Sequence, residues 1–285
     1  MMKDMTPERT EKLLNYNGSD RIITFQEKQQ EIEQVNQGKE TKKITIAKFP
    51  DMNRAIKYFG LGDLILLTGK PKSGKTLYAQ TLTLDFQKEH DISSLWFQYE
   101  VMPEMFLESF PEGVIPLIGY LPREMKAGSS NWLEERIDEA LIKDEARNGQ
   151  RTLYAVFLDH IHFVFDIFKS RNPSIEIGQI VRQLKTIAIE KQLIIFVMCH
   201  MKKVLTDEPS GYDARDSSFL MGECDKSFTM WRLQDEENIS VLKVDVDRRT
   251  GALARKFKLL KTPKGYFREV AEVVDDEQTD KRGWL

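Results

Sequence analysis

Residues 64–80 read LILLTGKPKSGKTLYAQ, and this stretch decides the fold. It begins as an apolar run typical of a buried strand, passes through a turn with two glycines, and continues in a pattern typical of a helix. The turn matches G-x-x-x-x-G-K-[ST] at every position. Its residues are Gly69, Lys70, Pro71, Lys72, Ser73, Gly74, Lys75 and Thr76. A strand, a glycine-rich loop and a helix in this order predict a phosphate-binding loop (P-loop).

The residue types of this loop fit the chemistry of a magnesium nucleotide. Glycine lets backbone N–H groups approach a β-phosphate where a Cβ atom would obstruct them. We expect Lys75 to reach the β- and γ-phosphates and the Thr76 hydroxyl to ligate Mg²⁺. ATP and Mg²⁺ are therefore the predicted ligands. The alternative, a chance match or an inactive relic, is disfavoured by the flanking strand and helix.

Two carboxylates at the ends of apolar runs are the predicted partners of the loop. Asp159 ends YAVFLD and is expected to hold the water shell of the magnesium ion, although an aspartate there could also cap a turn. Glu100 ends SLWFQYE and is the candidate base for the attacking water. For Glu100 we expect a RecA-type sheet in which its strand neighbours the P-loop strand. The alternative is a solvated glutamate.

His160 and His162 form an H-x-H pair directly after Asp159. Two imidazoles on one face of a strand could bind a metal ion, but such a site needs a third ligand. No nearby residue has the spacing for one. We therefore interpret both histidines as structural.

The rest of the chain predicts an α/β fold. Apolar strands alternate with amphipathic helices, which favours a mainly parallel sheet with helices on both faces. The further strands are expected at 94–100, 154–159 and 193–199, and the helices at 131–149 and 175–191. After residue 225, short β runs predict antiparallel strands that extend this sheet.

The chain is expected to contain one domain with two extensions. Residues 1–20 are interpreted as a mobile arm, and residues 21–43 as a linker-like helix too polar to anchor itself on its own core. The motor domain is expected at 44–270. Residues 271–285 form an acidic tail ending in Trp and Leu, interpreted as a solubilising tail rather than a polymerase-docking segment.

Composition places few limits on function. The 285 residues carry a formal net charge of −3, so any nucleic-acid binding must come from local patches. The two cysteines lack metal-ligand or disulfide spacing, which suits the reducing cytoplasm. No apolar run approaches the length of a membrane-spanning helix, and no membrane association is expected.

Several segments together resemble the DnaB-like replicative helicases, a hexameric branch of the RecA-type ATPases. The similarity spans about residues 21 to 270. Its segments are KFPDMNRAIKYFGLGDLILLTGKPKSGKT, WFQYEVM, VFLDHIHFV, VRQLKTIAIEKQLIIFVMCHMKK, DARDSSFLMGECDKSFTMWR and VDVDRRTGA. The resemblance implies a RecA-like ATPase core, and it assigns the catalytic glutamate to Glu100 and the magnesium aspartate to Asp159.

Other site residues are implied by the same resemblance. His200 stands where the family usually has a glutamine that senses the γ-phosphate, and an imidazole there would make the step sensitive to pH. Arg215 matches a DNA-facing loop, in which Phe219 and Met221 depart from the family's polar residues. Lys169 and Arg171 lie in the position of a second DNA loop, although two basic residues in a loop are more often solvated surface.

The segment VDVDRRTGA is similar to the turn that delivers an arginine finger to a neighbouring subunit's nucleotide. The spacing leaves Arg248 and Arg249 as equal candidates, and Lys243 lies far upstream for a companion lysine. Without a partner subunit, both arginines would be ordinary solvated charges.

The resemblance implies a hexameric ring that hydrolyses ATP and moves 5′ to 3′ on single-stranded DNA, with a primase or polymerase as partner. Bacterial members carry an N-terminal helical domain for which this chain leaves no room, so we expect a single-domain form of the kind found in phages or plasmids. A RecA- or RadA-like accessory ATPase that does not unwind DNA is the alternative. A non-motor nucleotide switch is disfavoured by Lys75, Glu100 and Asp159.

Overall fold

The computed structural model describes residues 6–18, 21–36, 42–113, 116, 119–125, 130–161, 173–201, 208–213, 217–251 and 254–273. The chain divides into two compact units, Met1–Thr41 and Lys42–Leu285, close to the predicted boundary at residue 44. Three predicted DNA-contacting residues lie outside the described residues: Lys169, Arg171 and Arg215. His162 and residues 274–285 of the predicted acidic tail also lie outside them.

The described residues of the first unit form two helices. Helix α1 (Pro7–Leu14) lies within the predicted arm and was not expected from the sequence; Thr6 caps it by accepting a hydrogen bond from the backbone N–H of Arg9 at 3.3 Å. Helix α2 (Phe25–Asn36) lies within the segment 21–43. It begins with a reciprocal cap, in which the N–H of Thr24 donates to Glu27 at 2.6 Å and the N–H of Glu27 donates to the Thr24 hydroxyl at 3.1 Å.

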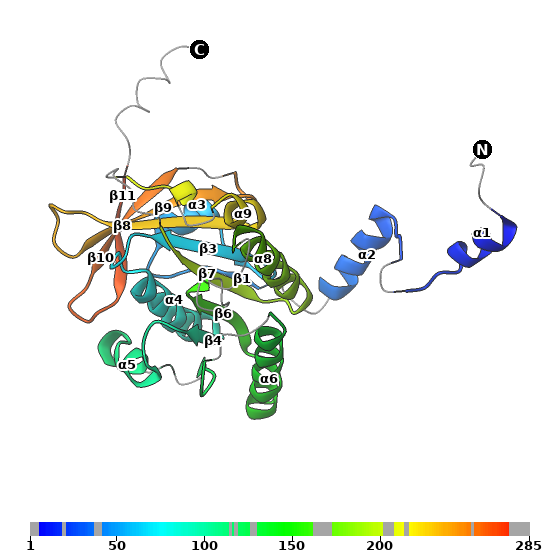
Figure 1. Cartoon of the computed structure of the whole chain (residues 1–285), viewed down its shortest axis with the longest axis horizontal. Coiled ribbons are helices and arrows are strands. Elements are labelled where there is room, and N and C mark those ends of the chain that lie inside the picture. Colours follow the sequence, from blue (N-terminus) through cyan, green and yellow to red (C-terminus); the bar gives the residue numbers. More distant parts are fainter. Residues whose placement is uncertain are drawn as a thin grey trace, which may run out of the picture. The chain divides into compact units, whose positions relative to one another are not determined.

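The described residues of the second unit form a nine-stranded sheet in the order β11-β10-β9-β8-β3-β7-β6-β4-β5, which Figure 1 shows with helices packed beside it. From β8 to β5 neighbouring strands run parallel, whereas β8, β9, β10 and β11 pair in antiparallel fashion. This confirms both the parallel core and the antiparallel extension. The strands are β3 (Leu64–Gly69), β4 (Ser93–Gln98), β5 (Gly119–Tyr120), β6 (Leu153–Asp159), β7 (Ile194–His200), β8 (Lys226–Arg232), β9 (Ile239–Asp247), β10 (Arg255–Lys261) and β11 (Phe267–Val273).

Helices and turns connect the strands and cover the sheet. Two long helices fall within two residues of the bounds predicted at 131–149 and 175–191: these are α6 (Ser130–Asn148) and α8 (Pro173–Glu190). The other helices are α4 (Lys75–His90), α3 (Pro50–Ile56), α5 (Pro103–Glu108) and α9 (Ser217–Glu223), with the 3-10 turns η1 (Pro111–Gly113) and η3 (Gly211–Asp213). A separate two-stranded antiparallel sheet pairs β1 (Lys43–Ile44) with β2 (Phe59–Gly60).

Alternation along β3 explains why both faces of the sheet are covered. Ile65 and Leu67 face one apolar core, which includes the α4 side chains Tyr78 and Phe86. Leu64, Leu66 and their neighbours face a second core, to which α6 and α8 contribute. Successive side chains of a strand point to opposite faces, so a strand that is apolar throughout must be buried on both.

One expectation about the sheet is wrong. Strand β4, which leads to Glu100, does not neighbour β3; β7 and β6 lie between them. Apolar strand patterns contain no information on strand order, because every buried parallel strand reads alike. The side chain of Glu100 nevertheless reaches the same pocket as the P-loop, as described below.

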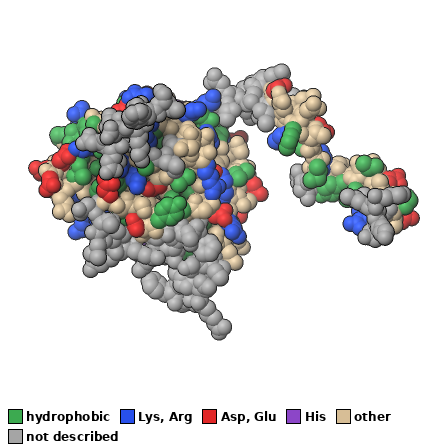
Figure 2. Space-filling model, turned by 90° about the horizontal axis from the view of Figure 1, so that it is seen from above, with side chains coloured by type: hydrophobic (Ala, Val, Ile, Leu, Met, Phe, Trp, Pro, Cys, Tyr) green, Lys and Arg blue, Asp and Glu red, His purple; other side chains and the backbone are tan. Residues whose placement is uncertain are grey.

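Charges are mixed over the face seen in Figure 2, where Lys and Arg side chains are interspersed with Asp and Glu. This agrees with the net charge of −3. Within the described part of the chain, no helix has the length and apolar character needed to cross a membrane.

Candidate nucleotide-binding site

The P-loop connects β3 to α4 in the predicted way, and two of its glycines are required by the local backbone. Gly74 caps α4 with a left-handed φ of 98°, and a Cβ atom there would lie 2.9 Å from the Phe267 ring. A Cβ atom on Gly69 would lie 2.2 Å from the carbonyl oxygen of Met230 in β8. The loop is therefore packed against the antiparallel strands as well as the parallel core.

Lys75 is buried, and its ammonium group curls back over the loop. Its Nζ donates to the carbonyl oxygens of Gly69 at 3.2 Å and Lys70 at 3.3 Å, and lies 3.5 Å from Nδ1 of His200. Burial lowers the pKa of this lysine, while Asp159 and Glu100 oppose that shift. A buried ammonium group that forms no ion pair in the described part of the chain is well suited to receive an anion.

Thr76 and Asp159 lie together, as predicted for a magnesium site. The Thr76 hydroxyl donates to Oδ2 of Asp159 at 2.7 Å, and the side-chain amide of Gln98 donates to the same oxygen at 3.1 Å. Burial raises the pKa of Asp159, and the nearby Glu100 charge adds to the rise. A hydroxyl and a carboxylate are ligands that Mg²⁺ accepts, so this pair fits the predicted ion.

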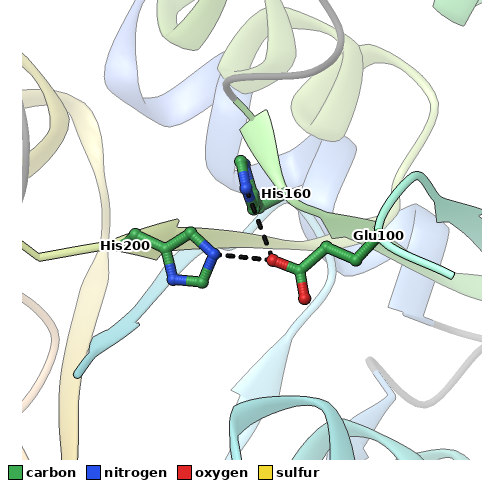
Figure 3. A group of neighbouring side chains, drawn as sticks. All are labelled: Glu100, His160 and His200. Carbon is green, nitrogen blue, oxygen red and sulfur yellow. Dashed lines mark hydrogen bonds and ion pairs between the residues drawn. The ribbon is translucent and has the colours of Figure 1, made fainter. Parts of the chain in front are cut away.

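Glu100 contacts two histidines (Figure 3). Its Oε1 lies 2.6 Å from Nε2 of His200 and 3.4 Å from Nε2 of His160. The two imidazole rings meet edge to face with centroids 4.4 Å apart. The hydrogen bond from His200 is the main cause of the lowered pKa of Glu100, so the carboxylate is ionised at neutral pH.

Sequence reasoning missed two members of this cluster. The Gln98 side chain accepts a hydrogen bond from the Glu100 backbone N–H at 2.7 Å and so connects Glu100 to Asp159. His160 was interpreted as structural for want of a third ligand, but it contacts Glu100, and His200 lies beside it. The relevant partners come from β7 and from the end of β4, so no local spacing could reveal them.

The site opens into a pocket of about 580 Å³. One wall is formed by the P-loop, Asp159, Glu100 and His200, and the other by antiparallel strands, including Arg232, Lys261 and Phe267. The Ser240 hydroxyl donates to the Ser73 carbonyl oxygen at 3.1 Å, and the Phe267 N–H donates to the Thr81 hydroxyl at 3.1 Å. The C-terminal strands therefore hold the outer side of the P-loop.

The two candidate finger arginines lie away from this pocket. Both arginines follow β9, whose final residue Asp247 pairs with Lys226 at the start of β8. Lys226 lies beside the amino end of β3, whereas the P-loop follows the carboxyl end of β3. Arg249 donates to Asp63 at 2.8 Å, and Arg248 donates to the carbonyl oxygen of Gly222. Neither arginine serves the nucleotide site of its own chain.

The P-loop strand has β7 and β8 on its two sides, and Asp159 lies at the end of the strand beyond β7. This arrangement confirms the predicted fold class, a RecA-like P-loop NTPase core with an antiparallel extension.

The chain is similar in sequence to known replicative DNA helicases. The chain is 23% identical over 192 residues to the probable plasmid replicative DNA helicase of Chlamydia psittaci, covering 58% of this chain and 41% of that protein. It is 23% identical over 216 residues to the replicative DNA helicase DnaB of Rickettsia conorii, covering 64% of this chain and 44% of that protein. The chain thus spans less than half the length of these relatives. No protein-family model matches it.

Solved structures agree with these relatives. One solved ATPase domain matches with a TM-score of 0.69 and 15% identity, covering 87% of this chain and 99% of that one. A DnaB-like replicative helicase, studied with its interactions with primase, matches with a TM-score of 0.68 and 14% identity, covering 93% of this chain and 71% of that one. The resemblance to DnaB-like replicative helicases is confirmed in sequence and in fold.

Proposed function

We propose that this chain is the ATP-hydrolysing motor of a ring-forming DNA helicase that moves 5′ to 3′ on single-stranded DNA during replication. The observation that carries the proposal is the convergence of Lys75, Thr76, Asp159 and Glu100 on one pocket. The similarity to replicative helicases supports DNA as the track. The proposal also places the motor in the cytoplasm, with the replicating DNA.

The residues of the pocket fit a magnesium nucleotide. The Ser73 hydroxyl oxygen is buried without a hydrogen-bond partner among the described residues, and Gly69 and Gly74 leave a cradle that a Cβ atom would disturb. In this proposal the P-loop amides and Lys75 bind the phosphates of ATP, and Thr76 and Asp159 hold Mg²⁺. The ion would supply positive charge that neutralises the transferring phosphoryl group.

Glu100 is the proposed base, and His200 the proposed sensor. The Glu100 carboxylate is ionised and lines the pocket, so it can accept a proton from an attacking water. His200 contacts both Glu100 and Lys75, and a change at the phosphates can therefore reach the base through one side chain.

The ring, the DNA contacts and the protein partner extend the proposal. In this proposal Arg248 or Arg249, which lie at the amino end of the parallel strands and away from the pocket, acts as an arginine finger on a neighbouring subunit of a hexameric ring. Lys169, Arg171 and Arg215 are the proposed contacts to the DNA backbone. We further propose that α2 packs on the adjacent subunit and that a primase or polymerase binds the ring.

Steady-state ATP hydrolysis with and without a single-stranded oligonucleotide tests the proposal, with Lys75→Ala as the blank. We expect strong stimulation by DNA, weakened by added salt because the contacts are ionic, followed by 5′ to 3′ unwinding of a forked duplex. Hydrolysis that is indifferent to DNA would contradict the motor and indicate an accessory ATPase with a protein partner.

Particle shape separates the two DNA-dependent alternatives. Negative-stain images with ATP and Mg²⁺ are expected to show closed rings. Continuous filaments would favour a RecA- or RadA-like protein instead.

A further inference from the structure

Glu100, His160 and His200 form a cluster whose geometry suits more than a hydrogen-bonded base. One ligand atom from each residue can be chosen so that all three atoms lie within 4.8 Å of one another. Two imidazole nitrogens and one carboxylate oxygen form a ligand set that binds Zn²⁺ at sites with an open fourth position. The three side chains converge from the ends of β4, β6 and β7 on one point (Figure 3).

The distances need little change to admit an ion. Ligand atoms about 2.0 Å from a tetrahedral zinc ion are about 3.3 Å apart. The His160–Glu100 separation of 3.4 Å already has this value. The His200–Glu100 separation of 2.6 Å is that of a hydrogen bond, and rotation of the two side chains would open it.

Charge and access also favour a cation. Among the described residues, Glu100 and Asp159 bring two carboxylates to the cluster and Lys75 one ammonium group, and these three charges act on one another. The basic side chains Lys72, Arg232 and Lys261 line other parts of the pocket. Asp159 is hydrogen-bonded to Thr76, so Glu100 supplies the carboxylate ligand. Glu100 and His200 line the nucleotide pocket, which gives an ion a path from solvent.

We propose that Glu100, His160 and His200 bind a transition-metal ion of the Zn²⁺ type, and that this ion inhibits the motor by occupying its base and its sensor. This site differs from the magnesium site at Thr76 and Asp159. Nitrogen ligands favour zinc over Mg²⁺, which prefers oxygen. An ion at Nε2 requires that nitrogen's lone pair, so a proton held there leaves on binding. The binding of the ion does not depend on the proposed function, whereas the inhibition rests on the proposed ATPase activity.

Cobalt titration of the full chain, without nucleotide and without a histidine tag, tests the binding. Co²⁺ replaces Zn²⁺ and gives visible absorption bands at four- or five-coordinate sites. We expect one ion per chain, with affinity at least tenfold weaker in His160→Ala and in His200→Gln. His200→Gln guards against misfolding, because glutamine keeps a hydrogen-bonding group at the half-exposed position; circular dichroism checks both variants.

His90→Ala is the matched control, since His90 lies at the end of α4 and contacts the Thr45 carbonyl oxygen at 2.7 Å, away from the cluster. It should bind Co²⁺ like the parent. Absence of visible bands in the parent, or equal affinity in the parent and both cluster variants, would overturn the proposal.

Inhibition is measured as the ratio of each protein's own ATP hydrolysis with and without micromolar Zn²⁺, at saturating Mg²⁺. Zn²⁺ is expected to lower the ATP hydrolysis rate of the parent at least tenfold and that of His200→Gln less than twofold. Equal loss in both would overturn the inhibitory role. If the parent binds Co²⁺ through these residues but does not hydrolyse ATP, the metal site is supported and the proposed motor is contradicted. If the parent shows DNA-stimulated hydrolysis but binds no Co²⁺, the motor is supported and the metal site is contradicted.

Discussion

Buried lysine and aspartate side chains lie near both ends of strand β3, but their contacts differ. At the amino end, Lys226 is 1% exposed and its Nζ lies 2.9 Å from Asp247 and 3.9 Å from Asp63. At the carboxyl end, Lys75 is 6% exposed and donates to carbonyl oxygens of its own loop. One end closes its charges in ion pairs, whereas the other leaves an ammonium group beside an open pocket.

The presence or absence of a carboxylate partner distinguishes a structural lysine from a ligand-binding one better than burial or residue type does. A buried lysine with a carboxylate partner is already neutralised, so it has no need of a ligand. A buried lysine such as Lys75, which forms no ion pair within the described residues, keeps its charge available for an anion such as phosphate. The predictions below test whether the two ends can be told apart in this way.

The largest effect is expected from Lys226→Ala at the amino end. The substitution leaves Asp247 buried without its ammonium partner, which costs about 3–5 kcal/mol of the free energy of unfolding. Denaturant unfolding measures the loss. The double variant Lys226→Met with Asp247→Asn removes both charges and keeps the side-chain oxygen that accepts from the N–H groups of Arg249 and Thr250, so it should recover most of the loss. A double variant as unstable as the single one would contradict the ion-pair explanation.

At the carboxyl end, Glu100→Gln should lower ATP hydrolysis by about 10³-fold, because an amide cannot act as the base. Unfolding should change little, since the side chain still reaches the two imidazoles. Single-turnover hydrolysis and nucleotide binding are measured on the same preparation. Turnover at the parent rate would show that another group activates the water.

A smaller effect is expected from Arg249→Ala. The substitution removes a hydrogen-bonded partner from the buried Asp63, but half-exposed Arg249 is screened by solvent, so about 1–2 kcal/mol of unfolding free energy is lost. Arg248→Ala is the matched control, because its guanidinium group donates to a carbonyl oxygen rather than to a buried carboxylate. DNA-stimulated hydrolysis of both variants identifies the trans-acting arginine: the finger variant is inactive alone and lowers the activity of parent subunits in mixed rings.

The smallest effect concerns Glu269, a carboxylate away from both ends of β3. It accepts hydrogen bonds from the N–H groups of Asp51 at 2.9 Å and Met52 at 3.3 Å, and burial raises its pKa from 4.5 to about 7. An acid with a raised pKa binds protons more tightly when folded. The free energy of unfolding should therefore fall as pH rises from 4.5 to 7, by about 1 kcal/mol after solvent screening. Glu269→Gln should remove this slope in urea titrations; an unchanged slope would assign it to another group.

The sequence predicted the carboxyl end of β3 far better than the amino end. The P-loop depends on contiguous residue types, so Lys75 and Thr76 could be assigned directly, and Asp159, Glu100 and His200 follow apolar runs that mark strand ends. The resemblance to the helicases strengthened those assignments. Helix bounds were also well predicted, because α8 has a regular apolar face.

What the sequence could not predict depends on contacts between distant segments. The pairing of Lys226 with Asp247 and of Asp63 with Arg249 requires the order of the strands, which apolar patterns leave open. For the same reason β4 was placed beside β3, and His160 was interpreted without its partner Glu100. Helix α1 was missed because its eight residues bury none of their side chains, so the apolar pattern gave no signal.

The hydrogen bonds from Ser240 to Ser73 and from Phe267 to Thr81 join residues 167 and 186 positions apart. The ribosome makes the P-loop before these two partners, because Ser240 and Phe267 lie later in the sequence. While the chain is being synthesised, the loop therefore exists without its outer wall, and the nucleotide pocket is completed only when β11 has emerged. The outer wall is therefore the last side of this pocket to be added during synthesis.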